Sequence, residues 1–134
     1  MITENEIETA FGQELASPEI APIVWPNKTS ALPPKPYIVV QHVPATRNSP
    51  GMAGGGQIVG GAFVLTVVTG VNQFSTEANT LAAQIMARFS KASTLTAGTG
   101  KLRIGPADPV ALAPDRQDGD WRQPVRVTYT ATAR

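Results

Sequence analysis

One stretch of this chain, Gln57 to Gly70, constrains its fold more than any other. Read as a β-strand, it spans roughly 40 Å at about 3.3 Å per residue and is apolar on both faces. A strand of this kind is either central and covered on both sides, or covered on one face by its own helices and on the other by a neighbouring subunit. Gly60 and Gly61 predict a bulge or a sharp bend near its start.

Two segments have the spacing of amphipathic helices. The first begins with a capping box, in which Thr3 is the N-cap and Glu6 its partner, and it ends before Pro18. The second runs from about Ser75 to Phe89. Their apolar stripes consist of Ile7, Ala10, Phe11 and Leu15 in the first, and of Ala78, Leu81, Ala82, Ile85, Met86 and Phe89 in the second.

Three further strands are expected, at residues 37–43, at 101–104 and from 121 to about 131. The order is therefore helix, strand, strand, helix, strand, strand. This order predicts a single α+β domain over residues 1–134, with a four-stranded antiparallel sheet and both helices on one face. Long loops are expected at 44–56 and 105–120, which are rich in glycine, proline and aspartate.

Charge is divided unevenly along the chain. The first twenty residues contain five glutamates and no Lys or Arg, so the net charge of +1 leaves the remainder about six charges positive. If the last two strands pair, four cations share one exposed face: Lys101, Arg103, Arg122 and Arg126. Such a face is either simply solvated or a contact surface for a partner or a phosphate.

The composition removes most catalytic chemistry. The chain has no cysteine and one histidine, His42, so it has no thiol nucleophile and no zinc-type cluster. His42 shares a strand face with Ile38 and Val40, which favours a structural role. No Lys-Ser or Lys-Thr follows the glycines in the way a phosphate-binding loop requires. We therefore expect no enzyme, cofactor or metal. The sequence also has no apolar run long enough to cross a membrane, so we expect a soluble protein made in the cytoplasm.

Several short segments, in this order and at this spacing, resemble the tail-terminator-like proteins of long-tailed bacteriophages, prophages and gene-transfer particles. The resemblance covers nearly the whole chain. The segments that carry it are Val24-Trp25-Pro26-Asn27, Pro36-Tyr37, the loop into a long strand ending in Gly70, the helix with Ala82 and Phe89, and Trp121-x-x-Pro124-Val125-x-Val127-x-Tyr129.

The resemblance implies a non-enzymatic virion assembly protein. Such a protein forms a ring, typically a hexamer, on the end of a completed tail tube, stops tube polymerisation and presents the surface that joins tail to head. The implied partners are further copies of the chain, the major tail tube protein and a head-completion or connector protein. DNA would be passing cargo, because a near-neutral chain without a Lys/Arg run is not expected to bind it tightly. The implied location is the tail end at the neck of the virion.

Candidate contact residues come from the loops and from the two charged surfaces, since loops carry contacts while a sheet supplies rigidity. They are Arg47 and Met52 in the first long loop, Asp115, Arg116 and Asp118 in the second, Arg122 and Arg126 on the basic face, and Glu4 and Glu8 on the acidic helix.

Three alternatives remain open from the sequence. One is another neck or tail completion protein, which would share the particle but not the position. A second is a small nucleic-acid-binding module that uses Arg122 and Arg126 together with Tyr37 or Tyr129 as stacking groups. The third is an enzyme that combines His42 with a loop carboxylate.

Overall fold

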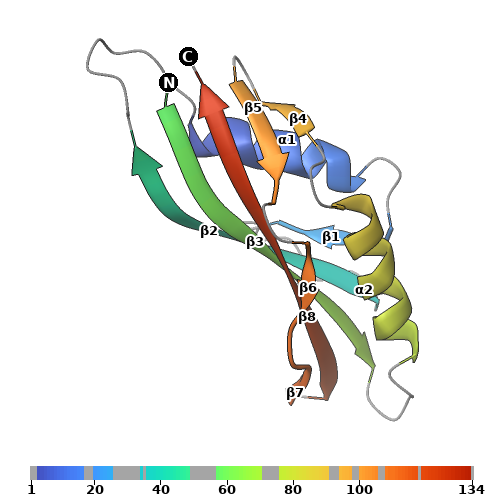
Figure 1. The fold of residues 1–134 in the computed structure, drawn as a ribbon. Coiled ribbons are helices and arrows are strands. Elements are labelled where there is room, and N and C mark those ends of the chain that lie inside the picture. Colours follow the sequence, from blue (N-terminus) through green and yellow to red (C-terminus); the bar gives the residue numbers. More distant parts are fainter. Residues whose placement is uncertain are drawn as a thin grey trace.

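The computed structural model describes residues 3–16, 20–25, 34, 36–48, 57–70, 76–90, 94–97, 100–105, 108–117 and 119–133. Two helices and eight strands lie in this part of the chain (Figure 1). They are α1 (Glu4–Ala16), β1 (Ile23–Val24), β2 (Tyr37–Asn48), β3 (Gln57–Gly70), α2 (Thr76–Arg88), β4 (Thr94–Ala97), β5 (Gly100–Ile104), β6 (Val110–Ala111), β7 (Asp115–Gln117) and β8 (Asp120–Ala133).

The sheet differs from the expected four-stranded antiparallel one. Its order is β1-β2-β3-β8-β5-β4, and β6 and β7 also pair with β8. It is mixed, because β1 runs parallel to β2. The prediction of a four-stranded antiparallel sheet is therefore wrong. The strands it omitted, β1, β4, β6 and β7, have two to four residues each, which is too short for side-chain alternation to be recognised in a sequence.

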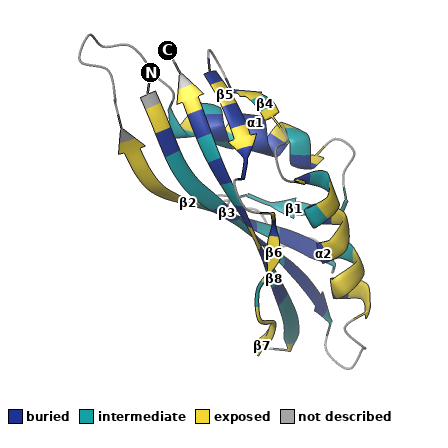
Figure 2. Ribbon diagram, in the orientation of Figure 1, coloured by how far each residue is buried: buried dark blue, intermediate teal, exposed yellow. Residues whose placement is uncertain are grey.

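The long apolar strand lies between two other strands of the sheet, whereas its two-faced pattern had left open whether the subunit itself covers both of its faces. β3 pairs with β2 on one side and with β8 on the other along almost its whole length. Its residue Phe63 lies between His42 of β2 and Val127 of β8. Figure 2 shows the consequence as bands of different burial that alternate along the strands.

The glycine pair in β3 lies opposite a bulge. The register of β2 against β3 shifts between Pro44 and Thr46, which face Gly61 and Gly60. β2 continues past the bulge to Asn48, so residues 44–48 of the expected loop are strand, and residues 49–56 lie outside the described residues. A proline was expected to end the strand, but β2 is at the edge here, where a missing N–H is tolerated.

Both helices pack on the same face of the sheet, here called the inner face. Phe11 of α1 is stacked between Phe63 of β3 and Phe89, which follows α2, with ring centroids 3.9 Å and 4.3 Å apart. One continuous core joins these rings to the apolar stripes of the two helices and to the inner residues of β2, β3, β5 and β8. The helix and long-strand predictions are thus confirmed.

The ends of α1 are held by side chains. The N–H of Thr3 donates to Oε1 of Glu6, and the N–H of Glu6 donates to Oγ1 of Thr3, each at 3.3 Å, which confirms the predicted capping box. At the other end, Nη1 of Arg88 donates to the carbonyl oxygens of Glu14 at 2.9 Å and Leu15 at 3.2 Å. A side chain of α2 therefore supplies hydrogen-bond donors to carbonyl groups in the last turn of α1. Ser75, expected to begin α2, lies outside the described residues.

The predicted loop before β8 is partly folded back onto it. Val110 of β6 pairs with Arg126, and Asp115 of β7 pairs with Arg122. Between these two strands, Nε2 of the buried Gln123 donates to the carbonyl oxygen of Leu112 at 2.6 Å. This segment adds two short strands to the sheet, a correction to its description as a loop.

Candidate assembly surfaces

The face of the sheet opposite the helices, here called the outer face, is exposed toward its Val43 end, whereas Tyr37 and Val68 at its other end are 3% and 0% exposed. Directly opposed residues of neighbouring strands point to the same side, so Val43, Ala62 and Thr128 share this face. Val43 is 42% exposed and Ile58 is 41% exposed, although both are large apolar side chains. The outer face is thus apolar along β2 and β3 and rich in threonine along β8.

A strip of cations continues the outer face over β5 and β8. Lys101 lies opposite Thr132, and Arg103 lies opposite Thr130, so both point to the same side as Arg126. Lys101, Arg103 and Arg126 are exposed. Arg122 also has outer-face register but is partly buried, and its Nε atom is enclosed without a hydrogen-bond partner.

The acidic helix α1 lies across the inner face, and its first turns contact β2. Nη2 of Arg47 donates to Oε1 of Glu4 at 2.6 Å. This hydrogen bond lowers the pKa of the Glu4 carboxyl below its ordinary value. Oε2 of Glu8 lies 3.9 Å from Nδ1 of His42. The structure therefore brings three of the predicted contact residues, Arg47, Glu4 and Glu8, to one end of β2.

His42 has the surroundings of a structural histidine. Its side chain is 7% exposed, its ring stacks on Phe63 with centroids 4.4 Å apart, and its Nε2 is 2.6 Å from Oη of Tyr129. Burial lowers the pKa of His42, against the opposing effect of Glu8 and Glu4, and burial also raises the pKa of Tyr129 to about 12. A closed, aromatic environment of this kind favours packing over proton transfer to a substrate.

The other predicted contact residues lie elsewhere. Asp115 and Arg116 are exposed on β7, at the end of the sheet away from the tip of β2 (Figure 1). Met52 and Asp118 lie outside the described residues. The candidate residues therefore do not form one patch, because those on β7 and those around Arg47 occupy opposite ends of the molecule.

Burial also bears on the nucleic-acid alternative. Tyr37 is 3% exposed and Tyr129 is 2% exposed, so neither ring can stack on a base without leaving the core. Neither aromatic group proposed for that role is available on the surface, which leaves only the cation strip for such a module.

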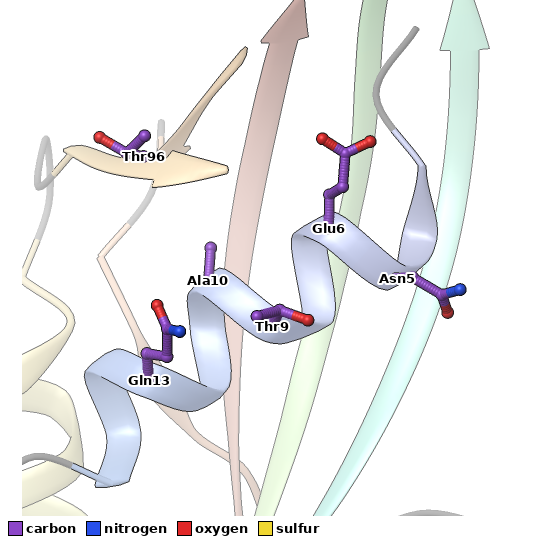
Figure 3. Close-up of a pocket in the computed structure, with 6 residues that line it drawn as sticks. All are labelled: Asn5, Glu6, Thr9, Ala10, Gln13 and Thr96. Atoms are coloured by element: carbon purple, nitrogen blue, oxygen red, sulfur yellow. The ribbon is translucent and has the colours of Figure 1, made fainter. Parts of the chain in front are cut away.

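Two surface grooves flank α1. One, of about 330 Å³, lies between α1 and the edge strand β4, and Figure 3 shows Glu6, Ala10 and Gln13 projecting from the helix on its β4 side. The other lies beside Trp25, the aromatic anchor of the segment after α1, whose ring covers Gly12. A Cβ atom at residue 12 would come within 2.6 Å of Cη2 of Trp25, so the ring needs a glycine there.

Sequence reasoning missed the exposed apolar pair and the groove. Ile58 had a signal in the two-faced pattern of β3, which required cover for a second face, whereas Val43 lies on β2 and had none. The groove had no such signal, because it depends on where β4 lies relative to α1. Across the described ranges, no helix has the length and apolarity needed to cross a bilayer, and no three His, Asp or Glu side chains gather as metal ligands.

Two solved structures share the fold of this chain. One solved structure superposes on the chain with a TM-score of 0.78 at 23% identity, covering 98% of this chain and 96% of the other. A chain from the virion of a native gene transfer agent particle superposes with a TM-score of 0.65 at 18% identity, covering 94% and 93%. These two likenesses concern the fold. No curated protein sequence shows detectable similarity to the chain.

The family assignment rests on the sequence over most of its length. The family model for the phage tail terminator protein matches residues 6–129, which extend from the first turn of α1 into β8. The chain therefore belongs to the phage tail terminator family and is a structural component of the virion tail.

Proposed function

We propose that the chain forms a ring of identical subunits, six by the family resemblance, that caps a completed tail tube. In this proposal the ring stops further addition of tube protein and presents the surface to which a head-completion or connector protein attaches. DNA passes through the ring as cargo. The protein is made in the bacterial cytoplasm and resides at the neck end of the tail.

The exposed Val43 end of the outer face is the observation that carries this proposal. A subunit whose helices both lie on the inner face leaves Val43 and Ile58 in water, and a monomer gains nothing from that exposure. A neighbouring subunit would remove this apolar surface from water. The family membership and the virion origin of one structural relative support a role in a particle as the setting for that contact.

Charge supports a contact between unlike surfaces. One side of the subunit carries the acidic α1, and the outer face carries the cation strip of Lys101, Arg103 and Arg126. Two different complementary surfaces on one subunit make head-to-tail contacts, which generate a closed ring when the rotation between subunits closes. Two copies joined through the same patch would instead give a dimer and leave a surface unused.

The test has two parts. The mass of the purified protein is measured by light scattering over a range of concentrations, and the protein is then added to uncapped tail tubes that are viewed by electron microscopy. We expect a six-subunit species and tubes that bear an extra ring at one end and no longer elongate. Ile58→Lys should weaken both results, whereas Gln84→Lys, on the exposed side of α2, should change neither.

The competing assignment is a neck or tail completion protein at another position. Binding to the portal or connector in the absence of tubes, with no binding to tube ends, would favour it. A protein that stays monomeric and binds neither tube ends nor connector would contradict the ring proposal altogether.

A further inference from the structure

The sheet ends in two different strands, and each has one side without a strand partner within the described ranges. β1 covers β2 only at Ile38 and Val39, so from Val40 onward no further strand lies beside β2. At the opposite edge, β4 pairs with β5 alone. Unpaired N–H and C=O groups on an edge strand are a template for another strand. Gln41 and Thr96, which lie on these two strands with outer-face register, are exposed.

We propose that neighbouring subunits join by main-chain pairing of residues 40–43 of one subunit with β4 of the next, so that the sheet continues around the assembly. This inference rests on the proposed ring, because it names one of the contacts between neighbouring subunits in that ring. The partner is a second copy of this chain.

The two segments match in length. β4 has four residues. On β2, pairing with β1 ends at Val39 and the bulge begins at Pro44. The regular strand between them that has no neighbour within the described ranges also has four residues, 40–43. Pro44 has no N–H to donate, and the bulge turns the strand, so a ladder that starts at Val40 stops there. Each segment spans about 13 Å, enough for one short ladder.

The direction of pairing follows from the topology. From β2 to β4 every neighbouring pair, β2 with β3, β3 with β8, β8 with β5 and β5 with β4, is antiparallel. The direction alternates through these strands, so β2 and β4 run the same way. A rotation that continues the sheet preserves this direction, and β4 therefore meets the next β2 in parallel. The outer residues Gln41 and Val43 then share a face with Thr94 and Thr96.

The groove beside β4 suits an incoming strand. It is lined by Asn5, Glu6, Thr9, Ala10 and Gln13 of α1 and by Thr96 of β4, mostly polar groups that can bond to an extended backbone. Figure 3 shows β4 pointing toward the Glu6 end of α1. A parallel β2 would therefore carry Arg47, which has inner-face register, toward this acidic end of the neighbouring helix. Arg47 binds Glu4 of its own helix at 2.6 Å, so the polar lining of the groove, and not an unpaired charge, is what favours this contact.

A cysteine cross-linking experiment tests the pairing directly, because the native chain has no cysteine and gives no background. The double variant Gln41→Cys/Thr96→Cys is treated with a short bis-maleimide, both as purified protein and after capping of tail tubes. We expect a ladder of covalent multimers on a denaturing gel. Each single variant should give no ladder, because a head-to-tail contact never places a residue beside its own copy. The matched control is Gln41→Cys/Gln84→Cys, with the second cysteine on the exposed side of α2.

Each outcome separates this inference from the ring proposal. If the wild-type protein caps tubes but the Gln41→Cys/Thr96→Cys variant gives no ladder in either state, the edge pairing is wrong and the ring stands. A strong dimer from Gln41→Cys alone would show β2 pairing with its own copy and would also overturn the inference. A wild-type protein that never binds tube ends counts against the ring proposal, whatever the cross-links show.

Discussion

His42 and Tyr129, 87 positions apart in sequence, are joined by a hydrogen bond of 2.6 Å between Nε2 and Oη. They belong to β2 and β8, which lie on either side of β3, so this bond bridges three strands on the inner face. Tyr129 can reach His42 only because Gly61 of β3, its register partner, has no side chain. The contact links Gly61 of β3, the buried histidine and the last strand.

Gly61→Ala should destabilise the fold. A Cβ at this position would lie 2.7 Å from Oη of Tyr129 and 2.8 Å from the carbonyl oxygen of Val43, and the second of these is backbone that cannot easily move. We expect a loss of about 1–3 kcal/mol in the free energy of unfolding, measured with urea. Gly70→Ala is the matched control, because a Cβ there meets nothing within 4 Å. Equal stability of the two variants would show that Tyr129 moves aside without cost.

Stability should fall on mild acidification because of His42. Burial lowers its pKa in the folded state below the ordinary value of 6.5, so the unfolded chain binds a proton that the folded chain resists. The contribution of neutral His42 to the free energy of unfolding is complete above pH 6.5, and it is lost as the pH falls from there toward the folded-state pKa. Urea unfolding between pH 5 and 8 measures this slope. His42→Gln should flatten it in this window, and an unchanged slope would assign it to other groups.

Arg88→Ala should lower the free energy of unfolding by weakening the contact between the two helices. It removes the hydrogen bonds to the carbonyl oxygens of Glu14 and Leu15 and a positive charge at the C-terminal end of α1. The expected loss is about 1–2 kcal/mol, measured by thermal or urea unfolding. Gln84→Ala, on the exposed side of the same helix, should stay within about 0.5 kcal/mol of the wild type. A similar effect of both substitutions would point to general helix propensity.

The Glu4–Arg47 ion pair should contribute little to folding. Both side chains are partly exposed, at 47% and 32%, so water and salt screen the attraction. A double-mutant cycle with Glu4→Gln and Arg47→Gln should give a coupling energy of about 0.2–1 kcal/mol, smaller at high salt. A larger coupling energy would mean that the protein in solution shields this ion pair from water more than the single subunit does.

Polar substitution on the outer face should affect assembly and leave folding intact. Val43→Thr and Ile58→Thr remove apolar surface that already faces water, so the unfolding free energy should change by less than about 0.5 kcal/mol. Light scattering should show a shift of the oligomer to higher protein concentrations. A normal oligomer in both variants would place the subunit contact on other residues.

Local patterns in the sequence determined much of this fold. Three features depend on residues within a few positions of one another: the capping box at Thr3, the apolar stripes of both helices and the two-faced apolar run of β3. Such features can be predicted from the local sequence. The same run indicated that the second face of β3 needs cover and left open whether the subunit itself or a neighbour provides it. The absence of cysteine and the single histidine excluded whole classes of chemistry by composition alone.

The tertiary structure decided what depends on contacts distant in sequence. The sheet gained short strands that pair with β2, β5 and β8, and no local pattern marks a two-residue strand. Arg47 is part of β2 because this strand continues past its bulge between Pro44 and Thr46, which lies opposite the glycines of β3. The two open edges, the groove beside β4 and the bond between His42 and Tyr129 likewise follow from which strands become neighbours. Which strands become neighbours depends on burial of the whole core, because the sheet forms by packing against α1 and not by local sequence patterns.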